Sequence, residues 1–356
     1  MAKQKIQLDG HKLMYHPEQI AKWIKGEVFA PIYVEIGPIR SCNHKCSFCS
    51  FDYLKRTGES IDKEVLIKNL KDMSEFGVKS IMFGGDGESL LYPYLPEVIE
   101  KAKNFGLDIA ITSNGVLLNE EKSKLILKNL SWIKISIDAG TKKSYAKIHG
   151  TKEQDFPLVL KNLKFACEYK IKNNLSCKIG CQMVVTDESI DGVENLILEL
   201  KDIGLDYFVL KPYVKHPLSI NEKKLSIKDY DSILSKLIKK YSNEKLNIIY
   251  RKISFLETEK ESLDYDECYG LNFMALIDAS GDVIPCGLFH DKEEFTYGNI
   301  NDKPFSEIWD SKKRLDITNK VYKRGCEKCR NHCRLNFINQ YLDVLKNNKK
   351  KHVNFI

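Results

Sequence analysis

The sequence lacks the apolar segments that mark export or membrane insertion. Residues Met1 to Lys5 contain no apolar signal-peptide core, and no stretch reaches the ~20 apolar residues that span a bilayer. There is also no internal repeat and no low-complexity linker. We therefore expect a folded cytoplasmic protein with no membrane partner.

A strong charge of one sign is absent as well. The chain carries 56 Lys and Arg against 49 Asp and Glu, a net charge of +7. Part of the excess lies in the tail at Lys346 and residues 349–351, which we interpret as a solvated terminus rather than a nucleic-acid-binding arm. Nucleic acid is therefore not an expected partner, whereas the modest positive field favours an anionic substrate.

The chain is long enough to bury a large core together with a smaller second one, with 356 residues of which 43% are hydrophobic. Its eleven cysteines do not predict a disulfide framework, because thiols stay reduced in the cytoplasm. Clustered cysteines there indicate metal binding or catalysis. Cys167, Cys177 and Cys181 lie on predicted helix- or core-facing positions, and we interpret them as buried apolar side chains.

Short β-branched runs alternate with helical patterns, which is typical of a parallel sheet built from βα units. The fold class is therefore α/β, a partial (β/α)6 barrel of the TIM type whose functional loops follow the strands. Six strands are expected, at Ile32–Ile36, Ser80–Phe83, Asp108–Thr112, Trp132–Ile137, Lys178–Val185 and Tyr207–Leu210. We divide the chain into an N-terminal extension (1–31), the barrel core (32–216), a connecting helical and strand segment (217–265), a small metal-stapled domain (266–340) and the basic tail (341–356).

Three cysteines follow the first expected strand, Cys42, Cys46 and Cys49, in the spacing C-x-x-x-C-x-x-C. One loop with three thiolates can hold three irons of a cubane cluster and leave the fourth iron open, as catalytic sites require. A zinc site completed by His44 is the alternative.

This spacing, with Phe48 before the last cysteine, resembles the signature of the radical S-adenosylmethionine (radical SAM) superfamily. The resemblance implies a 4Fe-4S cluster on Cys42, Cys46 and Cys49, whose open iron is chelated by S-adenosylmethionine. It further implies reductive cleavage of that cofactor to a 5′-deoxyadenosyl radical, which abstracts hydrogen from a substrate C–H bond. The protein then supplies position and excludes water.

The glycine-rich turn after the second strand resembles the family's Gly-Gly-Glu element, which contacts the methionine amino group. Asp86 stands where the family usually has Glu, and Glu88 follows two residues later. The family's downstream Arg-Gly is His149-Gly150 here, so Lys134, Lys147 or no cation takes the arginine's place. The cofactor-binding residues expected from the resemblance are Phe48, Gly84, Gly85, Asp86, Gly87, Glu88, Ser113, Asn114, Ser136, Gln182 and Leu210.

Five further cysteines lie outside the barrel, at Cys268, Cys286, Cys326, Cys329 and Cys333. The first two bracket a predicted hairpin turning at Ser280-Gly281-Asp282, and the others have knuckle spacing. A zinc ribbon is one interpretation. The pattern C-x12-G-x4-C also resembles the SPASM domain or its shortened twitch form. That resemblance implies one auxiliary iron-sulfur cluster, expected to be 4Fe-4S, on Cys268, Cys286, Cys329 and either Cys326 or Cys333.

Twitch-type relatives act on sugars, aminocyclitols and nucleotides, so we expect a sugar, aminocyclitol or nucleotide-sugar substrate, with dehydrogenation or epimerisation as the outcome. A peptide or protein maturase is the alternative, and a zinc-bound scaffold or nucleic-acid binder is an alternative of another class. A flavodoxin or ferredoxin would supply electrons. Candidate substrate-binding residues are Lys211, Lys215, His216 and Arg251, each of which has a solvated surface position as its alternative, and candidate hydrogen donors are Tyr213 and Cys333.

Overall fold

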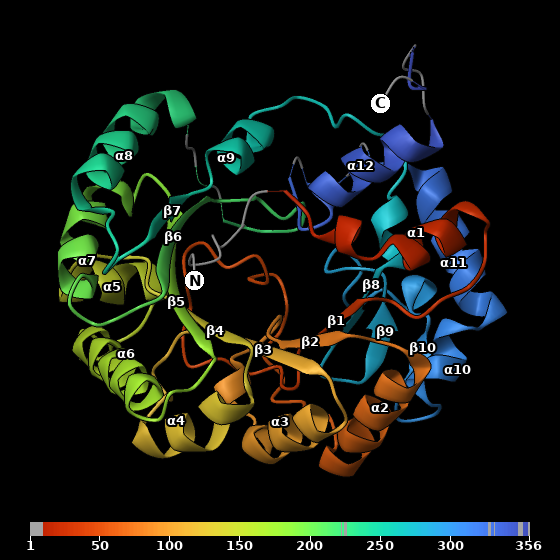
Figure 1. Cartoon of the computed structure of the whole chain (residues 1–356), viewed down its shortest axis with the longest axis horizontal. Helices are drawn as coiled ribbons and strands as arrows, with labels where there is room; N and C mark the ends of the chain where they lie inside the picture. The colour runs from red at the N-terminus through yellow and green to blue at the C-terminus, as the bar shows by residue number, and fades with distance from the viewer. Residues whose placement is uncertain are drawn as a thin grey trace.

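A computed structural model describes residues 10–221, 223, 226–326, 329–330, 332–347 and 352–354. One sheet runs through the molecule in the order β10-β9-β8-β1-β2-β3-β4-β5-β6-β7. Figure 1 shows it as a curved wall with α2, α3, α4, α6, α7 and α8 on its outer side. The strands are β1 (Tyr33–Ile36), β2 (Ser80–Phe83), β3 (Asp108–Ser113), β4 (Trp132–Ser136), β5 (Lys178–Val185), β6 (Tyr207–Pro212), β7 (Ile248–Tyr250), β8 (Met274–Ile277), β9 (Asp282–Ile284) and β10 (Gly298–Asn299).

The helices follow the strands in the alternation expected of a βα barrel. They are α1 (Pro17–Ile24), α2 (Lys63–Phe76), α3 (Leu95–Asn104), α4 (Glu120–Ile126), α5 (Lys142–His149), α6 (Asp155–Lys172), α7 (Val193–Leu200), α8 (Ile227–Tyr241), α9 (Lys252–Thr258), α10 (Phe305–Trp309), α11 (Lys312–Arg324) and α12 (Asn336–Lys346).

The six expected strands are confirmed, with ends that shift by one or two residues, and the α/β partial barrel is confirmed with them. A seventh parallel strand, β7, pairs with β6 and was missed. It is only three residues long and lies between charged helices, so it shows no alternation long enough to read.

Local sequence signals explain where the helices begin and end. Asp62 caps α2 by accepting hydrogen bonds from the backbone N–H groups of Glu64 and Val65, and Gly77 ends the helix in the left-handed region at φ +118°. Leu66 and Met73 on its apolar stripe are fully buried against the sheet. Burial of such stripes fixes the helices on the outer face.

Alternation along the strands decides which side chains reach the inside of the barrel. On β4, Ile133 and Ile135 are fully buried in the outer core, so Lys134 and Ser136 point to the inner side. The same core contains Cys167, Cys177 and Cys181, all completely buried as expected. The inner face is therefore the side on which polar chemistry can collect.

The cysteine-rich C-terminal part joins the barrel sheet directly. β8 pairs in parallel with β1, and β9 turns back antiparallel through Gly281, whose φ is +90°. The expected hairpin is thus present, but it extends the barrel sheet rather than forming a sheet of its own. The boundaries of the five segments stay a prediction, and residues 349–351 of the basic tail lie outside the described residues.

In the part of the chain that the structure describes, every helix is too short or too polar to cross a bilayer.

Candidate active site

The loop with Cys42, Cys46 and Cys49 follows β1 and is fastened to the end of α5. The backbone N–H of Lys45 donates to the carbonyl of His149 at 2.9 Å, and that of Ser47 donates to Ile148 at 2.8 Å. Gly150 is required beside this contact, because its φ is +57° and a Cβ would lie 2.4 Å from the Lys45 carbonyl oxygen. The loop that carries the cysteines is therefore held in place by backbone contacts.

The distances among the metal-binding side chains bear on the zinc alternative. A zinc ion bound to three thiolates brings the sulfurs to about 3.8 Å from one another, given Zn–S bonds of about 2.3 Å. Among the described residues, one group of three metal-binding side chains has its ligand atoms within 4.8 Å, and it is His44, Cys46 and His149. Across the same described residues, no three cysteine sulfurs lie within that distance of one another, although Cys326 and Cys329 are close enough for a hydrogen bond between their side chains.

Cys46 has a histidine against its sulfur. The Sγ of Cys46 lies 3.3 Å from Nδ1 of His149, and Nε2 of the same ring accepts the backbone N–H of Asp138 at 3.2 Å. His149 is fully buried, which holds its pKa well below the usual value. His44 instead has its ring 3.5 Å from the carboxylate of Asp155. His149, which occupies the family's arginine position, therefore contacts the cysteine loop.

The glycine turn after β2 packs directly on that loop. A Cβ on Gly87 would lie 2.0 Å from the Ile39 carbonyl oxygen, and one on Gly84 would lie 2.4 Å from the Thr112 hydroxyl. Asp86 is buried and accepts from Nε of Arg40 at 3.2 Å. Gly85 supplies the left-handed φ of +122°. Close contacts with Ile39 and Thr112 therefore require glycine in the turn, and the Asp86 carboxylate faces Arg40; the contact of this turn with the cofactor stays a prediction.

Glu88 ties the turn to the end of β3. Its carboxylate accepts from the Ser113 hydroxyl and from the backbone N–H of Asn114, both at 2.8 Å. Burial raises the pKa of Glu88, opposed by these hydrogen bonds. Asn114 in turn donates from Nδ2 to Oδ1 of Asn43, in the cysteine loop, at 2.7 Å. Three of the expected cofactor residues thus form one network that positions the cysteines.

Ser136 and Gln182 meet on the inner face. The Gln182 amide donates to the Ser136 hydroxyl at 2.7 Å, while its own Oε1 is buried with no hydrogen-bond partner among the described residues. Such an acceptor needs a donor to offset its desolvation. Leu210, on the neighbouring β6, instead belongs to the outer hydrophobic core. Ser136 and Gln182 are therefore together, and Leu210 is apart from them.

Lysines and an aspartate share the inner face beyond this pair. Burial lowers the pKa of Lys134 well below its usual value, with neighbouring Lys211 adding to the effect. Burial also raises the pKa of Asp138 and lowers that of Lys211, while each partially offsets the shift of the other. The barrel interior therefore brings together Lys134, Lys211 and Asp138, whose charged forms burial disfavours.

The auxiliary cysteines converge from the hairpin and the C-terminal knuckle. Cys329 N–H donates to the Cys326 carbonyl at 2.9 Å, and the Asn339 amide donates to Sγ of Cys268 at 3.3 Å. Burial raises the pKa of the Cys268 thiol, and neighbouring Cys333 and Cys286 raise it further. All five sulfurs therefore gather in one region, so the structure does not single out the fourth ligand.

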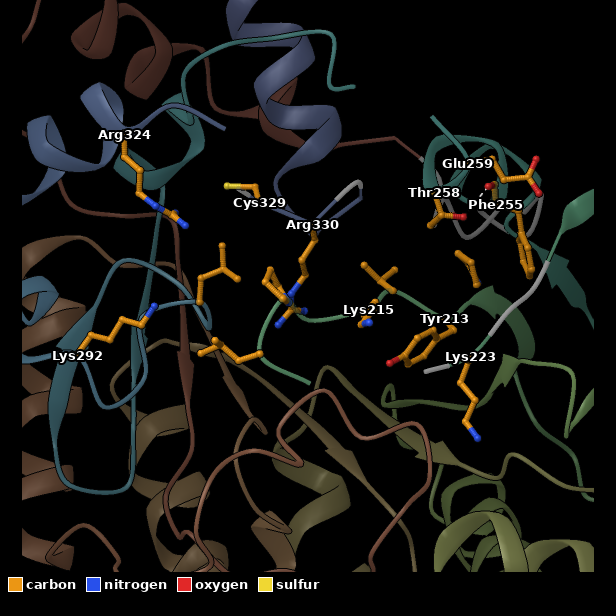
Figure 2. Close-up of a pocket in the computed structure, with 15 residues that line it drawn as sticks. Tyr213, Lys215, Lys223, Phe255, Thr258, Glu259, Lys292, Arg324, Cys329 and Arg330 are labelled. Atoms are coloured by element: carbon orange, nitrogen blue, oxygen red, sulfur yellow. Dashed lines mark hydrogen bonds between the residues drawn. The ribbon is translucent and has the colours of Figure 1, made fainter. Parts of the chain in front are cut away.

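A cavity of about 740 Å³ lies between the segment after β6, α9 and the auxiliary loop. Figure 2 shows Arg330 reaching from the auxiliary loop toward the segment that carries Lys215. Five cations line the cavity, with Glu259 as the one acidic lining residue. The cations are Lys215, Lys223, Lys292, Arg324 and Arg330.

The cavity includes some of the expected substrate residues and excludes others. Tyr213 and Lys215 line it. His216 is fully buried instead, stacked on Tyr53 at 4.6 Å between ring centres and 3.0 Å from the Gly287 carbonyl oxygen. Lys211 faces the barrel interior, and Arg251 precedes α9. The cavity therefore brings together two of the five expected side chains from this region.

Two arginines beside the cofactor loop were not predicted from the sequence. Arg40 bridges Asp86 and Asp278 at 3.2 and 3.1 Å, and so connects the glycine turn to the C-terminal hairpin. Arg56 donates to the Asp86 carbonyl and lies 3.7 Å from Sγ of Cys49. Both arginines lie close to the cysteines in the sequence, which could have drawn attention to them. The groups that they contact on Asp86 and Asp278 lie much further along the chain.

The donor set fits an iron-sulfur cluster and S-adenosylmethionine. Cys42, Cys46 and Cys49 stand as free thiols on one anchored loop, and Oε1 of Gln182, a buried acceptor with no hydrogen-bond partner among the described residues, faces the same interior. The five auxiliary cysteines provide enough thiolates for a second cluster. No fourth cysteine lies in the first loop, so one coordination position there is open.

Comparison with known proteins agrees with this donor set. The model of the radical SAM superfamily matches residues 36–208, and the SPASM iron-sulfur cluster-binding domain matches residues 268–334. The tungsten-containing aldehyde ferredoxin oxidoreductase cofactor-modifying protein of Pyrococcus furiosus is 24% identical over 79% of this chain and 81% of that protein. A cysteine-type anaerobic sulfatase-maturating enzyme of Clostridium novyi is 24% identical over 83% of this chain and 86% of that protein.

Among solved structures, SuiB of Streptococcus suis bound to S-adenosylmethionine shares the fold. The TM-score is 0.64 at 18% sequence identity, and the match covers 86% of this chain and 72% of that one.

Proposed function

The chain belongs to the radical SAM superfamily and carries a SPASM iron-sulfur domain, and from that premise we propose that it is a maturase that oxidises an acidic segment of a peptide or protein. The comparisons favour this alternative over the sugar, aminocyclitol or nucleotide-sugar substrate that we expected. The sulfatase-maturating relative aligns over 83% of the chain, so the likeness includes both the barrel and the cysteine-rich part.

The observation that carries the proposal is the charge of the cavity. Five cations and one acidic residue line about 740 Å³ between the barrel mouth and the auxiliary cysteines. Arginine and lysine donors bind carboxylates through charge-assisted hydrogen bonds, and arginine can do so with two parallel bonds. A segment rich in Asp or Glu is the peptide chemistry that matches such a lining.

Bound 4Fe-4S cluster and S-adenosylmethionine together supply the hydrogen-abstracting chemistry. The protein's part is to hold the cysteine loop through Lys45 and Ser47, and to offer Ser136 and Gln182 to the cofactor from the inner face. Lys215 and Arg330 hold the acidic segment across the cavity, so that one of its C–H bonds is fixed next to the barrel mouth.

Oxidation is the outcome we propose, because Cys329 of the auxiliary set lines the cavity, whereas Cys333 does not. Once one hydrogen atom has been abstracted, the substrate radical has to lose one electron and one proton to complete an oxidation; a cluster on the auxiliary cysteines would accept the electron, and the proton would pass to solvent. Epimerisation needs a hydrogen donor at the opposite face of the substrate. The candidate donor Cys333 lies instead among the other auxiliary thiols. Electrons for the first cluster come in this proposal from a flavodoxin or ferredoxin.

The test is to incubate the reduced enzyme, S-adenosylmethionine and a set of acidic peptides, and to measure 5′-deoxyadenosine and peptide mass. We expect peptides to lose two hydrogen atoms, and the same peptides with Gln and Asn in place of Glu and Asp to react poorly. A product whose mass is unchanged in ordinary water, but which takes up one deuterium in heavy water, would identify epimerisation instead.

Substitutions of cations inside and outside the cavity test whether the cavity binds the acidic peptide. Arg330→Gln and Lys215→Gln should raise KM for acidic peptides by about tenfold each, the loss expected of one charge-assisted contact of roughly 1.5 kcal/mol. Lys164→Gln, on the exposed face of α6, removes a cation outside the cavity and should leave KM unchanged. Turnover of a sugar phosphate but of no peptide would overturn the proposal.

A further inference from the structure

His149 stands between a cysteine of the first cluster and the barrel wall. Its Nδ1 lies 3.3 Å from Sγ of Cys46, and its Nε2 accepts the backbone N–H of Asp138 at 3.2 Å. The side chain is fully buried. We propose that His149 donates its Nδ1–H to the Cys46 thiolate and thereby raises the reduction potential of the first cluster.

The position of the ring proton follows from the hydrogen bonds. A neutral imidazole carries one N–H, and the nitrogen that accepts the Asp138 backbone N–H has to be the unprotonated one. Nε2 also lies 3.4 Å from Oδ2 of Asp138, but the contact with the backbone N–H is the shorter one, and it leaves the proton on Nδ1, which faces the sulfur. A lone pair at Nδ1 would face the negative thiolate and be repelled, so cluster ligation favours the same tautomer.

The surroundings hold the ring in this orientation. Tyr145 stacks on His149 with ring centres 4.1 Å apart and an angle of 27°, and Phe48 meets it edge-on at 5.7 Å. The His149 carbonyl also accepts the backbone N–H of Lys45, in the cysteine loop. The imidazole and the loop that it contacts are thus fixed to each other at two points, which keeps the N–H directed at Cys46.

The effect on the cluster has a definite sign. A hydrogen bond places the positive end of the N–H dipole at the sulfur, which stabilises the reduced cluster because that state carries one more negative charge. Hydrogen bonds to cluster sulfurs are among the features that set the potentials of iron-sulfur proteins. Because burial excludes water from His149, the dipole acts in a weakly screened environment.

The test uses the fully loaded enzyme and follows the electron paramagnetic resonance signal that changes when S-adenosylmethionine is added, which isolates the first cluster. His149→Phe keeps a ring of similar size without a donor, and we expect it to shift the midpoint potential to a more negative value. His149→Gln retains an N–H donor and should restore part of the shift. His352→Gln, at an exposed histidine outside the cysteine loop, is the control and should leave the potential unchanged.

A second readout does not depend on a His149 variant. In the unmodified enzyme labelled with 15N-histidine, pulsed resonance spectroscopy should detect a histidine nitrogen coupled to the reduced first cluster, and this coupling should persist in His44→Gln. Full iron content with an unshifted potential in His149→Phe would overturn the proposal. Absence of the nitrogen coupling in the unmodified enzyme would overturn it as well, even if His149→Phe failed to fold.

Discussion

Nδ2 of Asn114 donates to Oδ1 of Asn43 at 2.7 Å, and so joins the end of β3 to the cysteine loop. Asn43 stands directly after Cys42, and the backbone N–H of Asn114 is itself held by Glu88. The glycine turn, β3 and the loop thus form a continuous hydrogen-bonded support. Supporting groups of this kind orient ligands and tune a metal centre.

Replacing Asn43 by Ala should weaken the support without removing any thiol. One side-chain hydrogen bond contributes about 1 kcal/mol, so we expect a loss of about that size in the free energy of unfolding. Asn114→Ala should cost more, because its Oδ1 also accepts the backbone N–H of Val116 at 3.1 Å. The double variant should lose less than the sum of the two, measured by thermal unfolding. Full additivity would show that the two residues do not interact in solution.

Gly87→Ala should displace the cysteine loop. The new Cβ would lie 2.0 Å from the Ile39 carbonyl oxygen and 2.7 Å from that of Ser41, so backbone rather than a flexible side chain has to move. We expect a destabilisation of about 1–3 kcal/mol and reduced iron in the first cluster. Gly180→Ala is the control, since its Cβ would meet the Tyr207 ring at 2.2 Å, away from the loop. That variant should lose stability but keep its iron.

Removing the first set of thiols should remove one cluster and all activity. With Cys42, Cys46 and Cys49 replaced by Ala, the iron content should fall from about eight to about four per chain, given two 4Fe-4S clusters. Release of 5′-deoxyadenosine should cease. Cys167→Ala, in the buried core, should keep both clusters. Zinc in place of iron in the unmodified protein would contradict the prediction.

Local signals were enough to predict the barrel and the cysteine loop. Strand alternation and helix spacing depend on near neighbours in the chain, which is why β1 to β6 were found. The three thiols could be read from spacing alone. Ser136 and Gln182 were each expected at the cofactor, and their pairing became visible only from the register of β4 and β5, which places them opposite each other.

Contacts between distant segments could not be predicted in this way. Arg40 meets Asp278 only because β8 pairs with β1, and nothing in the local pattern specifies that pairing. His216 looked like a substrate-binding cation after β6, yet it packs on Tyr53 from the first loop. His149 was noticed only as a departure from a family pattern, because the geometry that gives it a role comes from the fold.

The burial of His216 gives the protein a predictable dependence on pH. Burial lowers the pKa of His216 to about 4, whereas an unfolded histidine titrates near 6.5. Its contribution to stability is therefore complete above about pH 6.5, and it falls as the pH drops toward 4 because the unfolded state binds the proton first. His216→Gln removes this contribution, so the stability of the unmodified protein relative to this variant should fall by up to about 2 kcal/mol between pH 7 and pH 5. Thermal unfolding of both proteins across this range measures the difference in stability. His352→Gln, at an exposed histidine, is the control and should show the same dependence of stability on pH as the unmodified protein.

Parallel stability curves for the unmodified protein and His216→Gln would mean that His216 is protonated in the folded state, and hence that its contact with the Gly287 carbonyl does not keep it neutral.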